Sequence, residues 1–352
     1  MLSILFGLLY AFSSAGETLA IKALNYAPVP LILPTYTAFL SNQMWILMLP
    51  LYWYVMRGKK FSISWDQIYQ YICMGVLTFS VTLLRSIGVN VIPGSVFSLL
   101  ISTSILFNMI LSFLFLKKRF NTWHIGAATF CLSSAICIGV SAFITREEGT
   151  YNYTVGIPTS IAAAFFVAVM TVWQESIQKT WDDYNVRVVE MSIAASFIAF
   201  VITLVYSVFT KDIVEWKPSI DASTRTKEGL VLVSSVSVLL PVLKLLVRSS
   251  KYSTIQYSNA FFFEFVQSSA ALLTSVASIV IFGEPWGSVY IAAFFLLAIS
   301  FGLYTKAKMV EKERKEKEME MAMAMAPVVK ELCVVNPITH TEAKIEVTVT
   351  WK

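Results

Sequence analysis

The chain has 352 residues, of which 57% are hydrophobic and 14% charged, and its formal net charge is +5. A soluble domain averages about 45–50% apolar and about 25% charged residues, so this composition excludes an ordinary soluble protein. The small basic excess is explained by membrane topology, and no nucleic-acid partner is expected.

Apolar stretches of about 20 residues, the length that crosses a bilayer as a helix, recur along the sequence, and most charges lie between them. A backbone in hydrocarbon must satisfy its own hydrogen bonds, which a helix does within one segment. The sequence therefore predicts an all-α integral membrane protein with ten transmembrane helices, at residues 3–25, 30–56, 67–89, 93–116, 122–144, 154–177, 186–209, 228–247, 254–281 and 286–305.

The basic residues between these spans are unevenly distributed. If the N-terminus is cytosolic, the loops on that side hold ten Lys and Arg residues, and the opposite loops hold five. Cytosolic loops carry the positive excess, so both termini are predicted to be cytosolic, in a plasma membrane or a vacuolar or Golgi endomembrane. The ten are Arg57, Lys59, Lys60, Lys117, Lys118, Arg119, Lys179, Arg187, Arg248 and Lys251; the five are Arg146, Lys211, Lys217, Arg225 and Lys227.

One sequon supports this orientation. Asn152-Tyr153-Thr154 is the only N-x-S/T triplet, and Asn152 falls in a loop placed outside or in a lumen, where glycosylation occurs. Asn152 is therefore the predicted glycosylation site.

The composition changes after Lys306, where charged residues alternate from Lys312 to Glu320. Opposite charges three and four residues apart stabilise a solvated helix, so we expect the last helix to continue for a few turns. Beyond Pro327 we expect disorder, or at most a weak strand at Ile345–Val349. Residues 307–352 are thus interpreted as a cytosolic charged tail, with a partner-binding or regulatory role as the alternative.

Two weak similarities between the first and second halves of the sequence indicate an internal repeat. Phe113–Phe120 and, much later, Val280–Trp286 each end a long helix, make a tight turn and begin another helix. Gly16-Glu17-Thr18 is echoed by Gln174-Glu175-Ser176. Transporters are often built from inverted halves, so we expect two five-helix repeats of opposite topology, at residues 1–145 and 154–306.

This pattern resembles the drug/metabolite transporter (EamA-like) superfamily over about residues 3–305. The run from Ile92 to Leu100, continuing through Asn108 to Phe120, is similar to the fourth-helix region of its purine-permease-like and chloroquine-resistance-transporter-like branches. The resemblance implies a solute carrier for purine-like bases, other nitrogenous heterocycles, drugs or small peptides. Two departures are that the loop at Thr210–Thr226 lacks the cysteine of the second branch, and that Glu17 stands where purine permeases tend to carry Gly or Pro.

Ionisable residues inside a span need a partner or a wet cavity, and mark candidate functional sites. Glu264 lies near the middle of the ninth span among phenylalanines, where a carboxyl group could bind and release protons. Glu17 is the second candidate for proton coupling. The alternative for Glu264 is a structural ion pair, for example with Lys244.

Three cations also lie within spans. Lys244, three residues after Pro241, could bind an anionic solute, neutralise Glu264, or extend to the cytosolic interface. Lys22 is expected at the outer interface, and Arg85 is interpreted as an interfacial anchor that could also hold an anionic group.

Amide and aromatic side chains complete the predicted substrate site. Asn108 and Gln267 could hydrogen-bond the edge of a heterocycle, while Trp173 and Tyr257, with Trp45, could stack on its ring. Aromatic residues near span ends are usually interface anchors, which remains the alternative for them.

The sequence therefore predicts a secondary active transporter, coupled to protons and working by alternating access. The alternative is a nucleotide-sugar/nucleotide antiporter, whose cationic interior would hold phosphates. The sequence has no Walker A motif, no H-E-x-x-H motif, two histidines and scattered cysteines, so ATP-driven pumping, an enzyme, a metal site and a cofactor are not expected. The expected partners are the bilayer, the solute and protons; the oligomeric state is left open.

Overall fold

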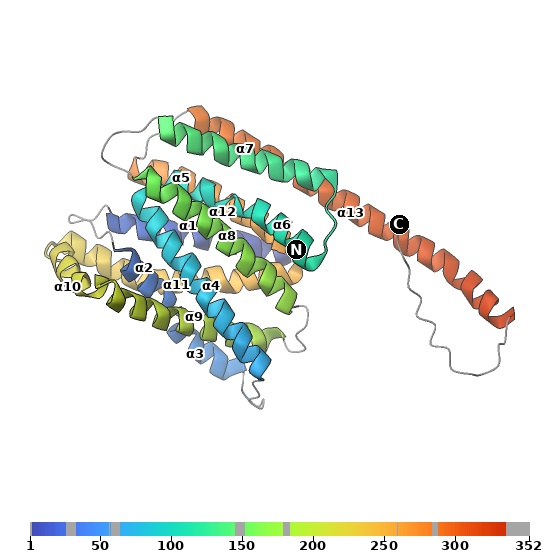
Figure 1. The fold of residues 1–352 in the computed structure, drawn as a ribbon, viewed down its shortest axis with the longest axis horizontal. Helices are drawn as coiled ribbons and strands as arrows, with labels where there is room; N and C mark the ends of the chain where they lie inside the picture. The colour runs from blue at the N-terminus through green and yellow to red at the C-terminus, as the bar shows by residue number, and fades with distance from the viewer. Residues whose placement is uncertain are drawn as a thin grey trace. The chain divides into compact units, whose positions relative to one another are not determined.

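A computed structural model of the chain describes residues 2–25, 33–55, 57, 64–144, 152–178, 184–258, 260–283 and 288–335. Every regular element within these ranges is a helix (Figure 1). Residues Met1–Leu303 form one compact unit and Tyr304–Lys352 a second. The helices are α1 (Leu2–Asn25), α2 (Pro34–Asn42), α3 (Met44–Val55), α4 (Trp65–Val91), α5 (Gly94–Ile101), α6 (Ser104–Leu116), α7 (Thr122–Ile144), α8 (Tyr153–Gln178), α9 (Tyr184–Phe209), α10 (Asp212–Ser223), α11 (Lys227–Tyr257), α12 (Ala260–Phe282) and α13 (Ser288–Val335).

Within the described ranges, eight helical segments are long and apolar enough to cross a membrane, so the prediction of a multi-pass, all-α protein is confirmed. The eight leave out two predicted spans: α7, and the second span, which is divided into α2 and α3 of 9 and 12 residues. The segments are Ile4–Asn25, Trp65–Val91, Val96–Leu116, Tyr153–Gln178, Val186–Phe209, Lys227–Tyr257, Phe262–Phe282 and Ile291–Glu311.

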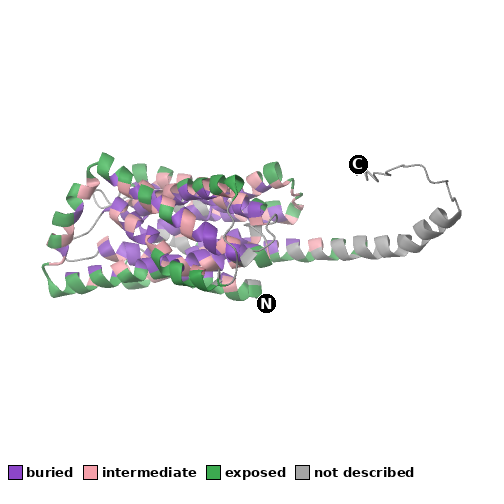
Figure 2. Cartoon of the chain, turned by 90° about the horizontal axis from the view of Figure 1, so that it is seen from below, coloured by how far each residue is buried: buried purple, intermediate pink, exposed green. Residues whose placement is uncertain are grey.

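Many polar side chains of the first unit are buried, and many large apolar ones are exposed; Figure 2 shows how buried and exposed residues are distributed along the helices. Ser112 and Thr171 are fully buried, whereas Val238 and Val280 are 71% and 77% exposed. Water would penalise such an outer surface, but lipid does not. Many buried hydroxyls bond to carbonyl groups of their own helices, as Thr171 does to that of Val167 at 2.7 Å. The arrangement is that of a protein whose outside faces hydrocarbon and whose inside is polar.

Helix ends follow the local sequence. Ser64 caps α4 by accepting from the backbone N–H of Gln67, whose side chain accepts in return from the N–H of Ser64, at 3.4 and 3.0 Å. Thr226 caps α11 by accepting from the N–H of Gly229. Lys117, at φ +50°, ends α6 in the left-handed conformation. The fourth predicted span is interrupted at Ser102 and Thr103, so α6 begins in the middle of the molecule.

α11 corrects the sequence prediction. A span ending at residue 247 and a loop carrying Arg248 and Lys251 were expected, but one helix of 31 residues runs through both. The serine and threonine hydroxyls of the polar stretch after Arg248 are satisfied inside this helix, because they bond carbonyl groups one turn earlier, as in Ser253 to Ser249 at 3.0 Å and Thr254 to Ser250 at 2.8 Å.

Packing in the first unit is reciprocal between the two halves of the chain. α1 packs on α11 and α12, while α8 packs on α4, α5 and α6. α7 and the first part of α13 lie side by side (Figure 1). There the Ser134 hydroxyl donates to the carbonyl of Ala293 at 2.8 Å, and the Ser300 hydroxyl donates to that of Ala127 at 2.6 Å. On each helix, the two residues in these bonds are seven positions apart.

The segment between α9 and α11, expected to be a loop, contains α10. Trp216 of α10 is buried, and its indole N–H donates to the hydroxyl of Thr35 on α2 at 3.2 Å. Its ring also packs on those of Tyr36 and Phe39. α10 is therefore attached to the second predicted span.

In the second unit, α13 continues through the charged residues after Lys306, as the charge pattern predicts, and runs to Val335. The expectation of disorder from Pro327 is therefore wrong as far as Val335. The possible strand at Ile345–Val349 lies outside the described residues.

Candidate functional site

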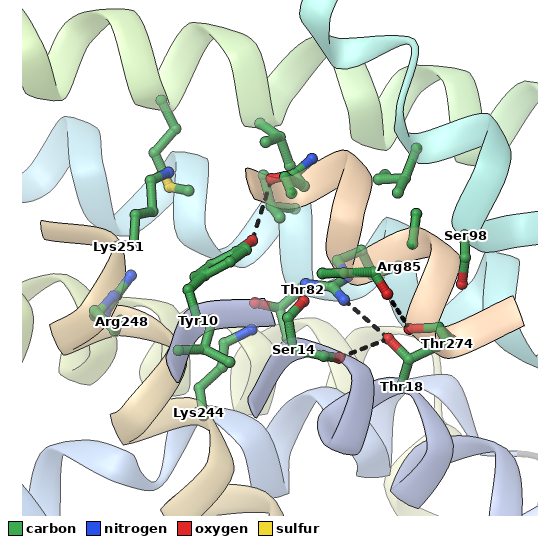
Figure 3. A pocket seen from close by; sticks show the side chains of 18 of the residues that line it. Tyr10, Ser14, Thr18, Thr82, Arg85, Ser98, Lys244, Arg248, Lys251 and Thr274 are labelled. Carbon is green, nitrogen blue, oxygen red and sulfur yellow. Dashed lines mark hydrogen bonds between the residues drawn. The ribbon is translucent and has the colours of Figure 1, made fainter. Parts of the chain in front are cut away.

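A cavity of about 60 Å³ lies at the centre of the first unit, between α1, α4, α5, α8, α11 and α12 (Figure 3). The first three helices belong to one half of the chain and the last three to the other. A volume of this size holds a few water molecules. Its position between the halves, within a polar interior, makes it the candidate binding site of this protein.

The walls of the cavity are cationic. Lys244, Arg248 and Lys251 are spaced four and three residues apart, which places them on one face of α11. Figure 3 shows them along one side, with Arg85 of α4 on the other. No carboxylate is among the residues that line the cavity within the described part of the chain.

Glu17 of α1 does not line the cavity but contacts two of these cations. Its Oε1 accepts from Nζ of Lys244 at 2.8 Å, and its Oε2 lies 3.6 Å from a guanidinium nitrogen of Arg85. The other Arg85 terminal nitrogen donates to the hydroxyl of Thr18 at 3.1 Å. Lys244 therefore pairs with Glu17 and not, as one prediction had it, with Glu264. Arg85 lines the cavity and is not an interfacial anchor.

Arg248 and Lys251 are held by uncharged groups. The Arg248 guanidinium donates to the hydroxyls of Thr78 and Ser196 and to the carbonyl of Ser192. Lys251 donates to the hydroxyl of Thr171 at 3.0 Å and lies 5.0 Å from the centre of the Phe263 ring. Among the described residues, no carboxylate lies within ion-pair distance of either cation.

Glu264 of α12 is fully buried beside the first turn of α6. It accepts from the hydroxyl of Ser104 and, at 3.3 Å, from the amide of Asn108. The Asn108 oxygen accepts in turn from Ser112 at 3.1 Å. Uncharged donors therefore hold this carboxylate where α5 passes into α6 through Ser102 and Thr103.

A chain of hydrogen bonds connects Glu264 with the cavity. The hydroxyl of Tyr10 donates to the side-chain oxygen of Gln267 at 3.2 Å, and the Gln267 amide nitrogen donates to Ser104 at 3.1 Å. Ser104 then donates to Glu264. Tyr10 and Gln267 line the cavity and Glu264 does not, so Gln267 is the connection between the two places.

The structure brings together most of the residues that the sequence singled out. Gln267, Asn108 and Glu264 form one network, and Lys244 and Glu17 form another. Trp173 packs instead among Tyr71, Met74, Met191, Ala195 and Tyr252. Tyr257 is 53% exposed and stacks on Phe6, with ring centres 5.8 Å apart. Neither lines the cavity, so their stacking on a substrate stays a prediction.

Two further expectations concern the ends of spans. Lys22 does not extend to the interface: it is 2% exposed, and its Nζ donates to the carbonyl of Ile92 at 2.9 Å, at the end of α4. Asn152 is exposed just before α8, where its side chain accepts from the N–H of Val155. Glycosylation of Asn152 stays a prediction.

Sequence reasoning missed Arg248 and Lys251, since it assigned both to a loop. Their spacing from Lys244 was the available signal, because cations at i, i+4 and i+7 share a face if the helix continues. Tyr10 and Gln174, both cavity-lining, had no comparable signal. Within the described residues, no group of three or more His, Cys, Asp or Glu side chains could hold a metal ion.

The apolar helices and the polar cavity between two halves define a multi-pass membrane transporter. A family profile identifies it further: that of PUNUT, purine nucleobase transmembrane transport, matches residues 1–315. The chain belongs to this family, which supports the purine-permease-like branch among the two predicted. A family of transporters also agrees with the prediction that the protein is not an enzyme.

No curated protein matches the chain. A solved structure titled "Crystal structure of protein" is similar, with a TM-score of 0.56 and 14% sequence identity, covering 88% of this chain and 98% of the other. At this identity, the similarity concerns the fold alone.

Proposed function

We propose that this protein carries a purine-type solute through the central cavity by secondary active transport coupled to protons. The observation that carries the proposal is the cavity itself, lined from both halves of a chain in a purine nucleobase transport family. Gln267 offers an amide that can donate to and accept from the edge of a base. Lys244 lines the same wall, the Tyr10 ring can stack on the base, and Asn108 supports Glu264 from behind.

Transport would proceed by alternating access between repeats at residues 1–145 and 154–306. Ten spans in two inverted repeats, as in the drug/metabolite transporter superfamily, agree with the reciprocal packing of α1 and α8 and with the paired bonds of Ser134 and Ser300. A cavity of about 60 Å³ is too small for a bicyclic base. Binding would therefore require the halves to separate on one side of the membrane.

Glu264 is the proposed proton carrier. Its protonation breaks no ion pair, and the Ser104 hydroxyl, which donates to the carboxylate, can accept from the acid. Asn108 can continue to donate to the carbonyl oxygen. The other charged group that acts on Glu264 is Lys251 of α11, which donates to Thr171. Glu17 is the second candidate, although its protonation would leave Lys244 and Arg85 without their carboxylate.

The test is uptake of radiolabelled adenine by proteoliposomes containing the purified full chain, with and without an inward proton gradient. Wild-type protein should concentrate adenine only with the gradient. Glu264→Gln should lose the gradient-driven uptake and keep exchange of labelled for unlabelled adenine, since exchange needs no net proton movement. Glu17→Gln is tested in parallel.

Glu215→Gln is the matched control, because Glu215 is exposed on α10 and should behave as wild type. An unchanged response to the gradient in both Glu264→Gln and Glu17→Gln would refute proton coupling through these residues. Absence of adenine uptake and exchange in wild-type protein, with hypoxanthine, guanine and urate also not carried, would refute the proposed function itself.

Exchange of nucleotide-sugars for nucleotides is a second candidate, favoured by the four cavity cations, because phosphate binding needs positive charge. Vesicles loaded with unlabelled nucleotide would then take up labelled nucleotide-sugar. Uptake of adenine into the same vesicles, without such exchange, would reject this alternative.

We further propose that both termini are cytosolic, in the plasma membrane or a vacuolar or Golgi endomembrane. Because Arg248 and Lys251 are buried, the ten basic residues counted on that side become 10 − 2 = 8, against five opposite, and the bias keeps its direction. A glycan lost in Asn152→Gln would support this orientation, whereas reaction of an impermeant reagent with Asn152→Cys from the cytosolic side would contradict it.

A further inference from the structure

The charges around the cavity do not balance. Four cations line it: Arg85, Lys244, Arg248 and Lys251. Two carboxylates belong to the same networks, Glu17 directly and Glu264 through Gln267 and Ser104. With all six groups charged, the described residues around the cavity carry a net charge of 4 − 2 = +2. An excess of buried charge is costly in a membrane interior unless a ligand or an ion meets it.

The excess can be located. Glu17, with one negative charge, engages two cations, Lys244 and Arg85, and Glu264 acts on Lys251 from beyond ion-pair distance, so each of the two groups keeps one excess positive charge. The direct partners of Arg248 and Lys251 are hydroxyls, a carbonyl and an aromatic ring. Both side chains are at least 93% buried and line the cavity from one face of α11. Two adjacent cations without a carboxylate form a site whose missing partner is an anion.

We propose that the cavity binds its solute as an anion: a heterocycle with a deprotonated ring nitrogen, such as an oxidised oxopurine, whose charge lies between Arg248 and Lys251. This proposal rests on the proposed function and specifies the form of the substrate. The uncharged edge of the ring meets Gln267, whose amide can both donate and accept. A neutral base would satisfy Gln267 but leave the charge of Arg248 and Lys251 unmet.

An anionic substrate also changes the electrical character of transport. One anion moving with one proton carries no net charge, whereas a neutral base moving with one proton carries a positive charge. Uptake of the anion with a single proton on Glu264 should therefore respond to the proton gradient and be insensitive to the membrane potential. This readout is independent of any substitution.

The experiment compares two purines of similar size in proteoliposomes at neutral pH: urate, a monoanion, and hypoxanthine, which is neutral. Wild-type protein should take up urate in preference to hypoxanthine, without dependence on an imposed potassium diffusion potential. Lys251→Gln and Arg248→Gln should each lower the ratio of urate to hypoxanthine uptake on the order of tenfold, because each removes a charge that only the anion uses.

Lys217→Gln is the matched control, since Lys217 is exposed on α10, and its ratio should equal that of wild type. Using the ratio separates lost selectivity from lost protein, because poor folding lowers both uptakes together. An unchanged ratio in both cavity variants, or preference of wild-type protein for hypoxanthine, overturns the anion proposal and leaves purine transport standing. Uptake of neither purine, nor of adenine, overturns the proposed function and this proposal with it.

Discussion

Two buried carboxylates of this protein lie in opposite kinds of environment. Glu17 is held by two cations, Lys244 at 2.8 Å and Arg85 at 3.6 Å. Glu264 is held by a hydroxyl and an amide, from Ser104 and Asn108, at the start of a half-helix. Both are at most 1% exposed, so burial alone does not distinguish them. Their hydrogen-bond and ion-pair partners distinguish the two carboxyl groups. A carboxylate paired with cations resists protonation, whereas neutral donors can hold either the charged or the protonated form.

The comparison separates structural from functional use of charge in a membrane interior. Glu17 neutralises cations that α11 and α4 would otherwise bury together, and so joins three helices. Glu264 is connected through Ser104 and Gln267 to the cavity, a connection that the proposed proton coupling requires. The following predictions test this division, from the largest expected effect to the smallest.

Glu17→Gln should lower the free energy of unfolding by about 3–5 kcal/mol, because it leaves Lys244 and Arg85 buried without a carboxylate. Thermal unfolding of the purified protein in detergent measures the loss. Glu17→Gln combined with Lys244→Gln should recover part of it, with a coupling of about 0.5–3 kcal/mol. Stability equal to wild type in the single variant would contradict the structural role of Glu17.

Gln267→Leu should raise the KM for purine uptake by about tenfold. It removes the amide that contacts the cavity and leaves the hydroxyl of Tyr10 and one bond of Ser104 unsatisfied, at a cost of about 1–3 kcal/mol. The same variant should weaken the response to the proton gradient, since it interrupts the chain to Glu264. Gln267→Glu, of equal size, is measured beside it as the comparison variant. An unchanged KM in Gln267→Leu would contradict a role of Gln267 in substrate binding.

Glu264→Gln should change the free energy of unfolding by less than about 1.5 kcal/mol, because the amide oxygen can still accept from Asn108, the amide N–H can donate to the Ser104 hydroxyl, and no ion pair is broken. Measured beside Glu17→Gln under identical conditions, the difference between the two variants is the direct test of the comparison. A loss in Glu264→Gln as large as that in Glu17→Gln would make Glu264 a structural residue.

Tyr257→Phe should leave stability within about 0.5 kcal/mol and the KM unchanged, since the ring can still stack on Phe6 and the side chain is largely exposed. Tyr10→Phe, in contrast, removes the hydroxyl that donates to Gln267 within the cavity. A raised KM in Tyr257→Phe would restore Tyr257 to the substrate site.

Much of the fold could be predicted from the sequence, since long apolar segments in lipid have helices as their only simple solution. The ends of the helices were harder to predict from the sequence. The polar run after Arg248 is typical of a loop when side chains are assumed to face water, whereas in the structure its hydroxyls bond carbonyl groups of the helix itself. The breaks at Gln43 and at Ser102–Thr103 likewise lie inside long apolar segments, at short polar runs that have no proline.

The sequence by itself determined that Glu17, Lys244 and Glu264 matter, because a charge within an apolar span needs a partner or water wherever the chain places it. Only the tertiary structure decided the partners. Lys244 meets Glu17 from 227 residues away, and Ser104 meets Glu264 from 160. No periodicity of one helix encodes such distances, since they depend on how helices of both halves pack. Because of that packing, Lys22 caps the end of α4, and Arg248 and Lys251, which the sequence assigned to a loop, line the cavity.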